Sequence, residues 1–204
     1  MEHVRFNLIT ADPARLGESI TFIESEVRPQ VDSQPGSLGT SLYTDPAHGL
    51  AIVESFWASD NAMAASEHTV SPQRREAVRR AAGTVSVERY QVPVFELEAP
   101  LSTGAGLRLT RMDIEPSRID DAIEAYGDTA VPWLADNAGF CSALLLVDER
   151  TGHAISETVW QNAEALAASR SVAAAIRVET VEATDCVVRA VEEYGLVATS
   201  ARRA

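Results

Sequence analysis

The sequence contains no lysine, so all 17 of its basic residues are arginine. This absence excludes a P-loop lysine, a Schiff base with pyridoxal phosphate and the phosphate-binding lysine of kinases. Acidic residues outnumber basic residues by 30 to 17, which gives a net charge of −13. Because nucleic acids and anionic membrane surfaces bind basic surfaces, we expect neither as a partner.

The sequence is also poor in the residues that build metal sites and membrane spans. Its two cysteines, Cys141 and Cys186, are far apart, and its four histidines do not cluster. No Cys-x-x-Cys, His-x-His or His-Glu-x-x-His spacing occurs, so we predict no metal site. The N-terminus lacks the apolar segment of a signal peptide, and no apolar run approaches the ~20 residues of a membrane helix. We therefore expect a cytoplasmic protein.

The chain contains an internal repeat. Residues 4–67 align without a gap with residues 107–170 when 103 is added to each number. The identical pairs fall throughout this alignment and include Arg5/Arg108, Pro29/Pro132, Gly36/Gly139, Glu54/Glu157, Trp57/Trp160 and Ser66/Ser169. Self-similarity at a fixed spacing indicates a duplicated structural unit. We predict one repeat at residues 1–98, a linker at 99–106 and a second repeat at 107–204.

Periodicity and turn residues predict the order strand, helix, strand, strand, helix, strand in each repeat. In the first repeat the predicted strands are His3–Thr10, Gly39–Thr44, Leu50–Trp57 and Thr84–Glu96. The first predicted helix begins at Pro13, after an Asp12 cap, and is closed by Pro29 and Gly36. The second covers Asn61–His68, restarts at Ser71-Pro72 and ends before Gly83.

This order is that of the ferredoxin-like β-α-β-β-α-β unit, so we predict an α+β protein. Helices cover one face of such a sheet, and the other face must be buried elsewhere. Two copies in one chain can bury each other's sheets. We therefore expect the two ferredoxin-like repeats to pack sheet to sheet as an intramolecular pseudo-dimer, and further self-association into a homo-oligomer stays open.

One stretch resembles a known family. Residues Ala51–Ser66 form a strand that ends at Trp57, followed by a polar cap and a helix of small residues, and Ala154–Ser169 repeat this pattern around Trp160. The pattern is similar to the antibiotic biosynthesis monooxygenase (ABM) type of domain, in the dimeric α/β-barrel superfamily. The resemblance covers nearly the whole chain twice. It implies a dimeric α/β barrel, here built from tandem domains, and whether the barrel closes within one chain or by swapping between two chains stays open.

The resemblance also implies a range of activities. Some members of the family oxidise phenolic or anthrone-like substrates with O2 and no cofactor, and others bind and degrade haem. Many members carry a histidine, and the haem degraders a tryptophan, where this chain has Ser66 and Ser169. At the place of the haem-ligating histidine this chain has Glu76 and Glu179. Haem binding is thus the less favoured interpretation, and we predict no cofactor.

Several residues are candidates for binding a small hydrophobic or aromatic molecule. Trp57 and Trp160 are candidate cavity walls, with core packing as the alternative. Arg5 with Glu54, and Arg108 with Glu157, are predicted to pair across neighbouring strands. These pairs would be structural ion pairs or polar anchors for a ligand oxygen.

Asn7 and His68 are the candidate catalytic residues. Asn7 could orient a phenolate or an oxygen adduct by a hydrogen bond, and His68 could act as a general base near neutral pH. Their counterparts in the second repeat are Thr110 and Ser171, which favours a site in the first. Two functions stay open: a cofactor-independent monooxygenase, and a non-catalytic ligand-binding or scaffold protein.

Overall fold

The computed structural model describes residues 1–202 and divides the chain into two compact units. Unit 1 consists of Met1–Arg89 and the chain from Leu196 onward, and unit 2 consists of Tyr90–Gly195. The boundaries of these units lie inside the last strand of each half. Each of these two strands is longer than the strands beside it, and its second part belongs to the other unit. The bounds of the two sequence repeats and the linker at 99–106 stay predictions.

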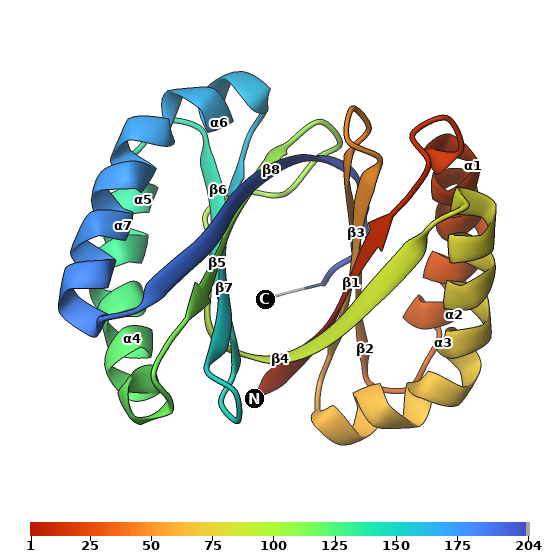
Figure 1. Ribbon diagram of the computed structural model, residues 1–204, viewed down its shortest axis with the longest axis horizontal. Coiled ribbons are helices and arrows are strands. Elements are labelled where there is room, and N and C mark those ends of the chain that lie inside the picture. The colour runs from red at the N-terminus through yellow and green to blue at the C-terminus, as the bar shows by residue number, and fades with distance from the viewer. Residues whose placement is uncertain (203–204) are drawn as a thin grey trace. The chain divides into compact units, whose positions relative to one another are not determined.

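Three strands of unit 1 pair antiparallel in the order β1-β3-β2: β1 (Glu2–Thr10), β2 (Ser37–Asp45) and β3 (Leu50–Trp57). The start of β4 (Thr84–Leu97) and the end of β8 (Val187–Thr199) also belong to unit 1. Helical segments follow β1 and β3 along the chain. They are α1 (Leu16–Phe22), η1 (Ile23–Val27), α2 (Arg28–Asp32) and α3 (Asp60–Ala81), and they cover one face of the sheet (Figure 1). At the far end of the chain, the backbone N–H of Ser200 donates to the Thr40 carbonyl in β2.

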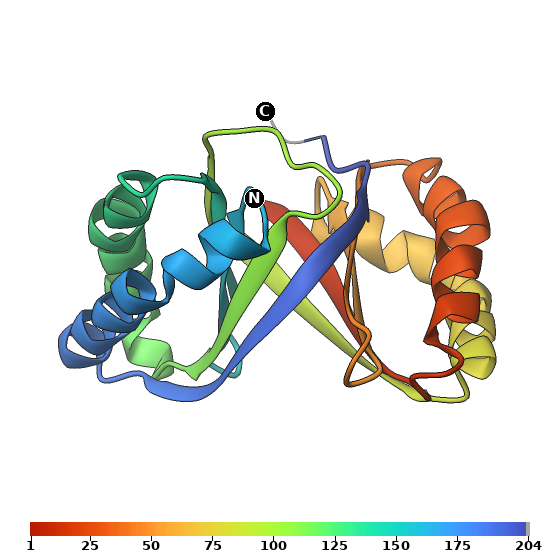
Figure 2. The same ribbon diagram turned by 90° about the horizontal axis from the view of Figure 1, so that it is seen from above.

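Unit 2 has the same order of elements. Its strands are the end of β4 (Thr84–Leu97), β5 (Gly106–Asp113), β6 (Phe140–Asp148), β7 (His153–Trp160) and the start of β8 (Val187–Thr199). They pair antiparallel in the order β8-β5-β7-β6-β4. Its helical segments are η2 (Pro116–Arg118), α4 (Ile119–Ala125), η3 (Tyr126–Ala130), α5 (Val131–Ala135), α6 (Ala163–Ala168) and α7 (Arg170–Thr184). Figure 2 shows these helices together on one side of the unit's strands. The predicted α+β class is confirmed.

The first helix of each unit continues through a proline, so the prediction that Pro29 closes it was wrong. Residues Ile23–Val27 form a turn of π-helix, and the Arg28 N–H accordingly donates to the Ile23 carbonyl five residues back. Pro29 is the second residue of the α-helical segment α2, where a residue without a backbone N–H is tolerated. Pro132 follows the π-helical turn η3 in the same way.

The second helix of unit 1 does not restart at Ser71-Pro72 as predicted. Helix α3 is continuous from Asp60 to Ala81 with Pro72 inside it, and its N-terminus is capped by Ser59 Oγ, which accepts from the Ala62 N–H. Buried residues lie on both sides of the proline, Met63 and Val70 before it and Ala77 after it. We attribute the continuity to this packing, which holds the helix across the missing backbone donor. In unit 2 the equivalent stretch is split into α6 and α7.

Each unit has its own apolar core between sheet and helices. In unit 1 the core includes Leu16, Ile23, Val31, Leu42 and Trp57, and in unit 2 it includes Ile119, Tyr126, Leu134, Leu145 and Trp160. Within residues 1–202, no helix is long and apolar enough to cross a membrane. The predicted packing of the two sheets against each other stays a prediction.

Candidate functional site

Arg5 and Glu54 do not form the predicted pair. In the ladder between β1 and β3, Arg5 lies opposite Ser55, and Glu54 lies opposite Phe6. Because successive side chains of a strand point to opposite faces, a shift of one residue puts Arg5 and Glu54 on different sides of the sheet. The same correction holds in unit 2, where Arg108 lies opposite Thr158 and Glu157 opposite Leu109.

Arg5 is instead buried between the sheet and α3. Its exposed fraction is 0%, and Nη1 donates to Ser66 Oγ at 3.1 Å while Nη2 donates to the Met63 carbonyl. Nη2 also forms an ion pair with Glu67 Oε2 at 3.2 Å, and the guanidinium lies 5.5 Å from the centre of the Trp57 ring. Burial lowers the pKa of Arg5 to about 10, against the opposing effect of Glu67. The arginine remains charged at neutral pH. The groups that bind its guanidinium are side chains and backbone of the protein itself.

Unit 2 repeats this arrangement around Arg108. Arg108 Nη1 donates to Ser169 Oγ, and Nη2 donates to the Leu166 carbonyl, both at 2.7 Å. Its carboxylate partner comes from β8, where Glu193 accepts from Arg108 Nη2 at 2.9 Å and from Arg170 at 2.6 Å. These bonds, with that from Arg170 the strongest, lower the pKa of Glu193. Ser66 and Ser169, which the resemblance places where many relatives have histidine, thus bind buried arginines.

The two predicted tryptophan walls are buried in the cores. Trp57 and Trp160 each have an exposed fraction of 0%. Each indole N–H donates to a hydroxyl two residues back, Ser55 Oγ at 3.0 Å and Thr158 Oγ1 at 3.1 Å. Trp160 also packs edge-on against Phe140, with ring centres 5.6 Å apart. Their packing matches the core alternative.

The structure places Asn7 and His68 in different surroundings. Asn7 is buried, its amide donates to the Val53 carbonyl at 2.8 Å, and its oxygen accepts from Arg74 Nη1 at 3.5 Å. Arg74 in turn pairs with Glu67. His68 lies on α3 with its side chain exposed. The catalytic roles predicted for the two residues stay predictions.

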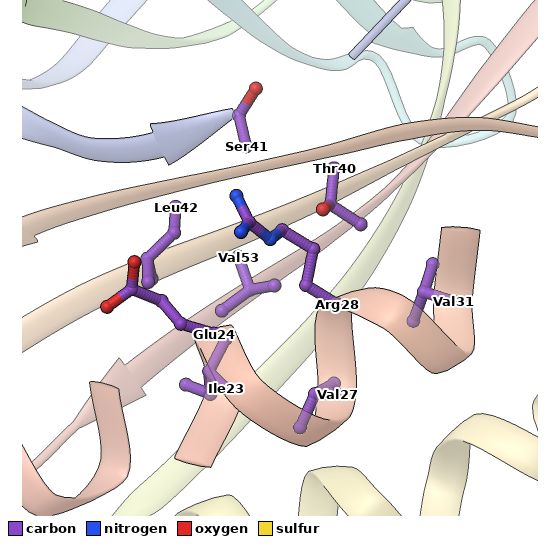
Figure 3. Close-up of a pocket in the computed structure, with 9 residues that line it drawn as sticks. All are labelled: Ile23, Glu24, Val27, Arg28, Val31, Thr40, Ser41, Leu42 and Val53. Carbon is purple, nitrogen blue, oxygen red and sulfur yellow. The ribbon is translucent and has the colours of Figure 1, made fainter. Parts of the chain in front are cut away.

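A pocket lies between the first helix of unit 1 and the sheet (Figure 3). Its apolar lining comes from the helix and from two strands: Ile23, Val27, Val31, Leu42 and Val53. Val53 is the residue opposite Asn7 in the ladder of β1 and β3. The π-helical turn η1 supplies Ile23 and Val27, and such turns occur frequently at functional sites.

Two charged side chains line this pocket beside its apolar residues. Glu24 and Arg28 are half-buried, and Figure 3 shows the Arg28 side chain reaching from the helix toward β2. In the described part of the chain neither of these two side chains takes part in a hydrogen bond or an ion pair. Ser41 points away from the helix in the same view and its hydroxyl hydrogen-bonds to Thr199 Oγ1 at 3.0 Å. Arg28 and Glu24 are thus the side chains that a polar ligand would meet first.

The pocket is narrow in this conformation. Its volume is about 260 Å³ when its open mouth is included. The enclosed part is large enough for about one water molecule. An aromatic ring would therefore enter only with a shift of η1 away from the sheet, or lie partly in the mouth.

Unit 2 fills the equivalent space with a tyrosine. Tyr126 and Ser156 stand where unit 1 has Ile23 and Val53. Tyr126 is buried, and its hydroxyl donates to the Glu157 carbonyl at 3.3 Å; burial raises its pKa. Gly127 and Val131 replace Glu24 and Arg28, so unit 2 lacks both charges.

The residues of the unit 1 pocket do not suit a haem group. Haem iron takes an axial ligand such as His, Cys, Met or Tyr. The pocket is lined by Ile23, Glu24, Val27, Arg28, Val31, Thr40, Ser41, Leu42 and Val53, and none of these is such a ligand. Within residues 1–202, no three His, Cys, Asp or Glu side chains gather where they could hold a metal ion.

Sequence comparison finds relatives in mycobacteria. The uncharacterized protein Rv2558 of Mycobacterium tuberculosis is 30% identical over 195 residues, which cover 95% of this chain and 83% of that protein. The chain belongs to the family of this protein. A second uncharacterized protein of the same organism, Rv2557, is 29% identical over 175 residues, covering 86% of this chain and 78% of that protein. No model of a known protein family matches the sequence.

Comparison with solved structures finds the same fold in monooxygenase-like proteins. A candidate monooxygenase from Lactobacillus acidophilus superposes with a TM-score of 0.72 at 15% identity, covering 98% of this chain and 96% of that one. An anthrone oxidase-like protein superposes with a TM-score of 0.71 at 18% identity, covering 98% and 93%. A haem-degrading enzyme of Listeria monocytogenes gives 0.55 at 7% identity, covering 94% and 98%. At these identities the comparison shows the fold.

The pocket residues Glu24 and Arg28 were not among the site residues predicted from the sequence. The signal was a difference between the repeats: Glu24 and Arg28 are charged where Gly127 and Val131 are not, and Ile23 is smaller than Tyr126. Residues that are identical in the two repeats, such as Trp57 and Trp160, build both cores. A site that is present in one unit and absent from the other is found at positions where the two repeats differ.

Proposed function

We propose that unit 1 binds a small aromatic molecule with an acidic hydroxyl or C–H group in the pocket under η1 and oxidises it with O2 without a cofactor. The observation that carries the proposal is Arg28, a half-buried cation without an ion pair in residues 1–202, on the wall of an apolar pocket. The monooxygenase-like proteins with this fold support the reaction class.

The charges of the pocket suit the first step of such a reaction. Oxygenation without a cofactor needs the substrate as an anion, which can pass electrons to O2. Glu24 would take the proton from the substrate, and Arg28 would stabilise the anion in an apolar surrounding, where an ion pair is stronger than in water. For an anthrone, the methylene carbon then binds one oxygen atom and becomes a carbonyl, and the other oxygen atom leaves as water with the two methylene hydrogens.

Asn7 would act in this account through its neighbours. Its amide holds the Val53 carbonyl, and Val53 is part of the pocket wall. His68 is not among the residues that line the pocket, so Glu24 takes the role of base that the sequence suggested for His68. Trp57 and Arg5 would support the wall from the core behind it.

We further propose that the two halves are tandem ABM-type domains whose sequences have diverged. The supporting observation is that the element order of unit 1 recurs in unit 2. Tyr126 closes in unit 2 the space that Ile23 leaves in unit 1. One copy would then keep the ligand site, while the other is packed solid at that place.

A non-catalytic binding protein is the second candidate function. The narrow pocket favours it, since its enclosed part holds about one water molecule. The two functions differ in whether oxygen is consumed when an aromatic ligand binds.

The test is oxygen uptake by the purified protein with a panel of quinols, anthrones and flavonoid-like phenols. We expect uptake that falls at least tenfold in Arg28→Gln and in Glu24→Gln. Glu26→Gln is the matched control, because Glu26 lies in the same helical turn, is exposed and does not line the pocket. Ligand-induced thermal shifts without uptake would favour the binding protein. Equal uptake by the wild type and the three variants would mean that the site lies elsewhere in the chain.

A further inference from the structure

A second groove lies in unit 2, between the helical segments α4, η3 and α5 on one side and α7 on the other. Its volume is about 390 Å³ with its open mouth included. Ile176 lines it and is 8% exposed, while Trp133 lines it with 42% of its surface exposed. Large exposed aromatic side chains in a concave site are common in binding sites.

Glu179 supplies the charge of this groove. It lies on α7, is exposed and lines the groove together with Trp133. In the described residues its carboxylate has neither a hydrogen bond nor an ion pair. An aromatic wall and a free carboxylate in one groove are the two features that recognise an organic cation.

In unit 1 an arginine side chain lies between an aromatic ring and a carboxylate. There the Arg80 guanidinium carbon lies 4.2 Å from the centre of the Phe22 ring. Arg80 Nε also donates to Glu76 Oε1 at 2.8 Å. A guanidinium of the protein itself thus lies between an aromatic ring and a carboxylate.

Unit 2 keeps the carboxylate but has lost the guanidinium. Adding 103 to each residue number leads from Glu76 to Glu179 and from Arg80 to Ala183, and both of these line the groove. The spacing holds to the end of the helix, since the left-handed caps Ala82 and Asp185 correspond in the same way. Phe22 is replaced by Ala125, while Trp133 supplies an aromatic ring from α5, at the place of Gln30.

We propose that this groove of unit 2 binds a small organic cation with a guanidinium group, in the place that Arg80 fills in unit 1. The guanidinium would pair with Glu179 and lie against the Trp133 ring, and its apolar part would cover Ile176. The net charge of −13 attracts cations to the protein in general. This site lies in the other unit from the proposed oxidation and does not depend on it.

The test is calorimetric titration of the whole chain with n-butylguanidinium, with Trp emission as a second readout. Trp133 is the exposed tryptophan, because Trp57 and Trp160 are 0% exposed. We expect one saturable site, and at least tenfold weaker binding of neutral n-butylurea. Glu179→Gln should weaken binding of n-butylguanidinium at least fivefold. Glu182→Gln, which removes an exposed carboxylate from the same helix outside the groove, should change it less than twofold.

Ala183→Arg is the sharper variant, because it gives unit 2 the arginine of unit 1. The new guanidinium should pair with Glu179 and abolish binding, while the urea midpoint of unfolding confirms that the variant is folded. The proposal is overturned if n-butylurea binds as well as n-butylguanidinium, if Glu179→Gln and Glu182→Gln weaken binding equally, or if folded Ala183→Arg still binds.

Discussion

Arg5 Nη1 donates a hydrogen bond to Ser66 Oγ at 3.1 Å, with no part of Arg5 exposed. The serine also donates to the Met63 carbonyl, so it joins the β1 arginine to the α3 backbone. Unit 2 makes the same link between Arg108 and Ser169. The residue at which the family resemblance implies a histidine or tryptophan is therefore used in both units to hold a buried arginine.

Ser66→Ala should destabilise the protein by about 1–3 kcal/mol, because it removes an acceptor from a buried cation. The measurement is the free energy of unfolding in urea. Ser71→Ala is the matched control on the same helix, since Ser71 accepts from the exposed Arg75, and it should change stability by less than about 0.5 kcal/mol. Equal effects of the two substitutions would mean that the buried link contributes little.

The strand order was predictable from the sequence, whereas the partners of the buried arginines were not. The alternation in residues 3–10 and the β-rich stretches around residues 39–44 and 50–57 locate β1, β2 and β3 within two residues of their observed ends. The patterns that locate the strands do not fix the register between β1 and β3. A register error of one residue places a side chain on the opposite face of the sheet. The prediction therefore paired Arg5 with Glu54, although the Arg5 side chain points toward α3.

The continuation of the two unit 1 helices through their prolines could not be predicted from the sequence either. Proline is a helix breaker on average, and Pro29 and Pro72 were interpreted in that way. The π-helical turn before Pro29 and the buried stripe around Pro72 are tertiary effects, which local preference does not contain. The pocket depends on this continuation, because η1 and α2 supply Ile23, Val27 and Val31.

Gly83→Ala should destabilise the protein by more than about 2 kcal/mol. A Cβ at this position would lie 2.0 Å from the Thr10 carbonyl oxygen, so the end of β1 and the end of α3 would have to separate. Gly17→Ala is the matched control in helix α1, where a Cβ meets nothing within 4 Å. It should stabilise by roughly 0.4–1 kcal/mol through the unfolded chain. A tolerated Gly83→Ala, seen as an unchanged thermal midpoint, would contradict the close approach.

Glu76 should make stability depend on acid pH. Hydrogen bonds from Arg79 and Arg80 lower the pKa of Glu76 to about 2. A lowered pKa in the folded state stabilises above the unfolded value near 4.5, and this contribution is lost as the pH falls toward 2. Glu76→Gln should therefore flatten the fall in unfolding free energy between these pH values. Glu179→Gln, its counterpart without an ion pair, is the control; an identical pH profile for wild type and Glu76→Gln would refute the assignment.

The difference between the units gives the most direct test of the proposed site. The double substitution Ile23→Tyr with Val53→Ser gives the unit 1 pocket the residues that fill the same space in unit 2. The mirror variant, Tyr126→Ile with Ser156→Val, changes the same two positions in unit 2. Both must unfold cooperatively in urea before they are compared.

The deciding measurement is oxygen uptake by the wild type and these two variants with the aromatic panel. If the unit 1 pocket is the site of oxidation, the filled unit 1 variant should lose at least tenfold in rate, while the folded mirror variant stays within about twofold of wild type. Unchanged uptake in the filled variant, or the absence of uptake by the wild type with every compound, would contradict the account of unit 1 as an oxygenase.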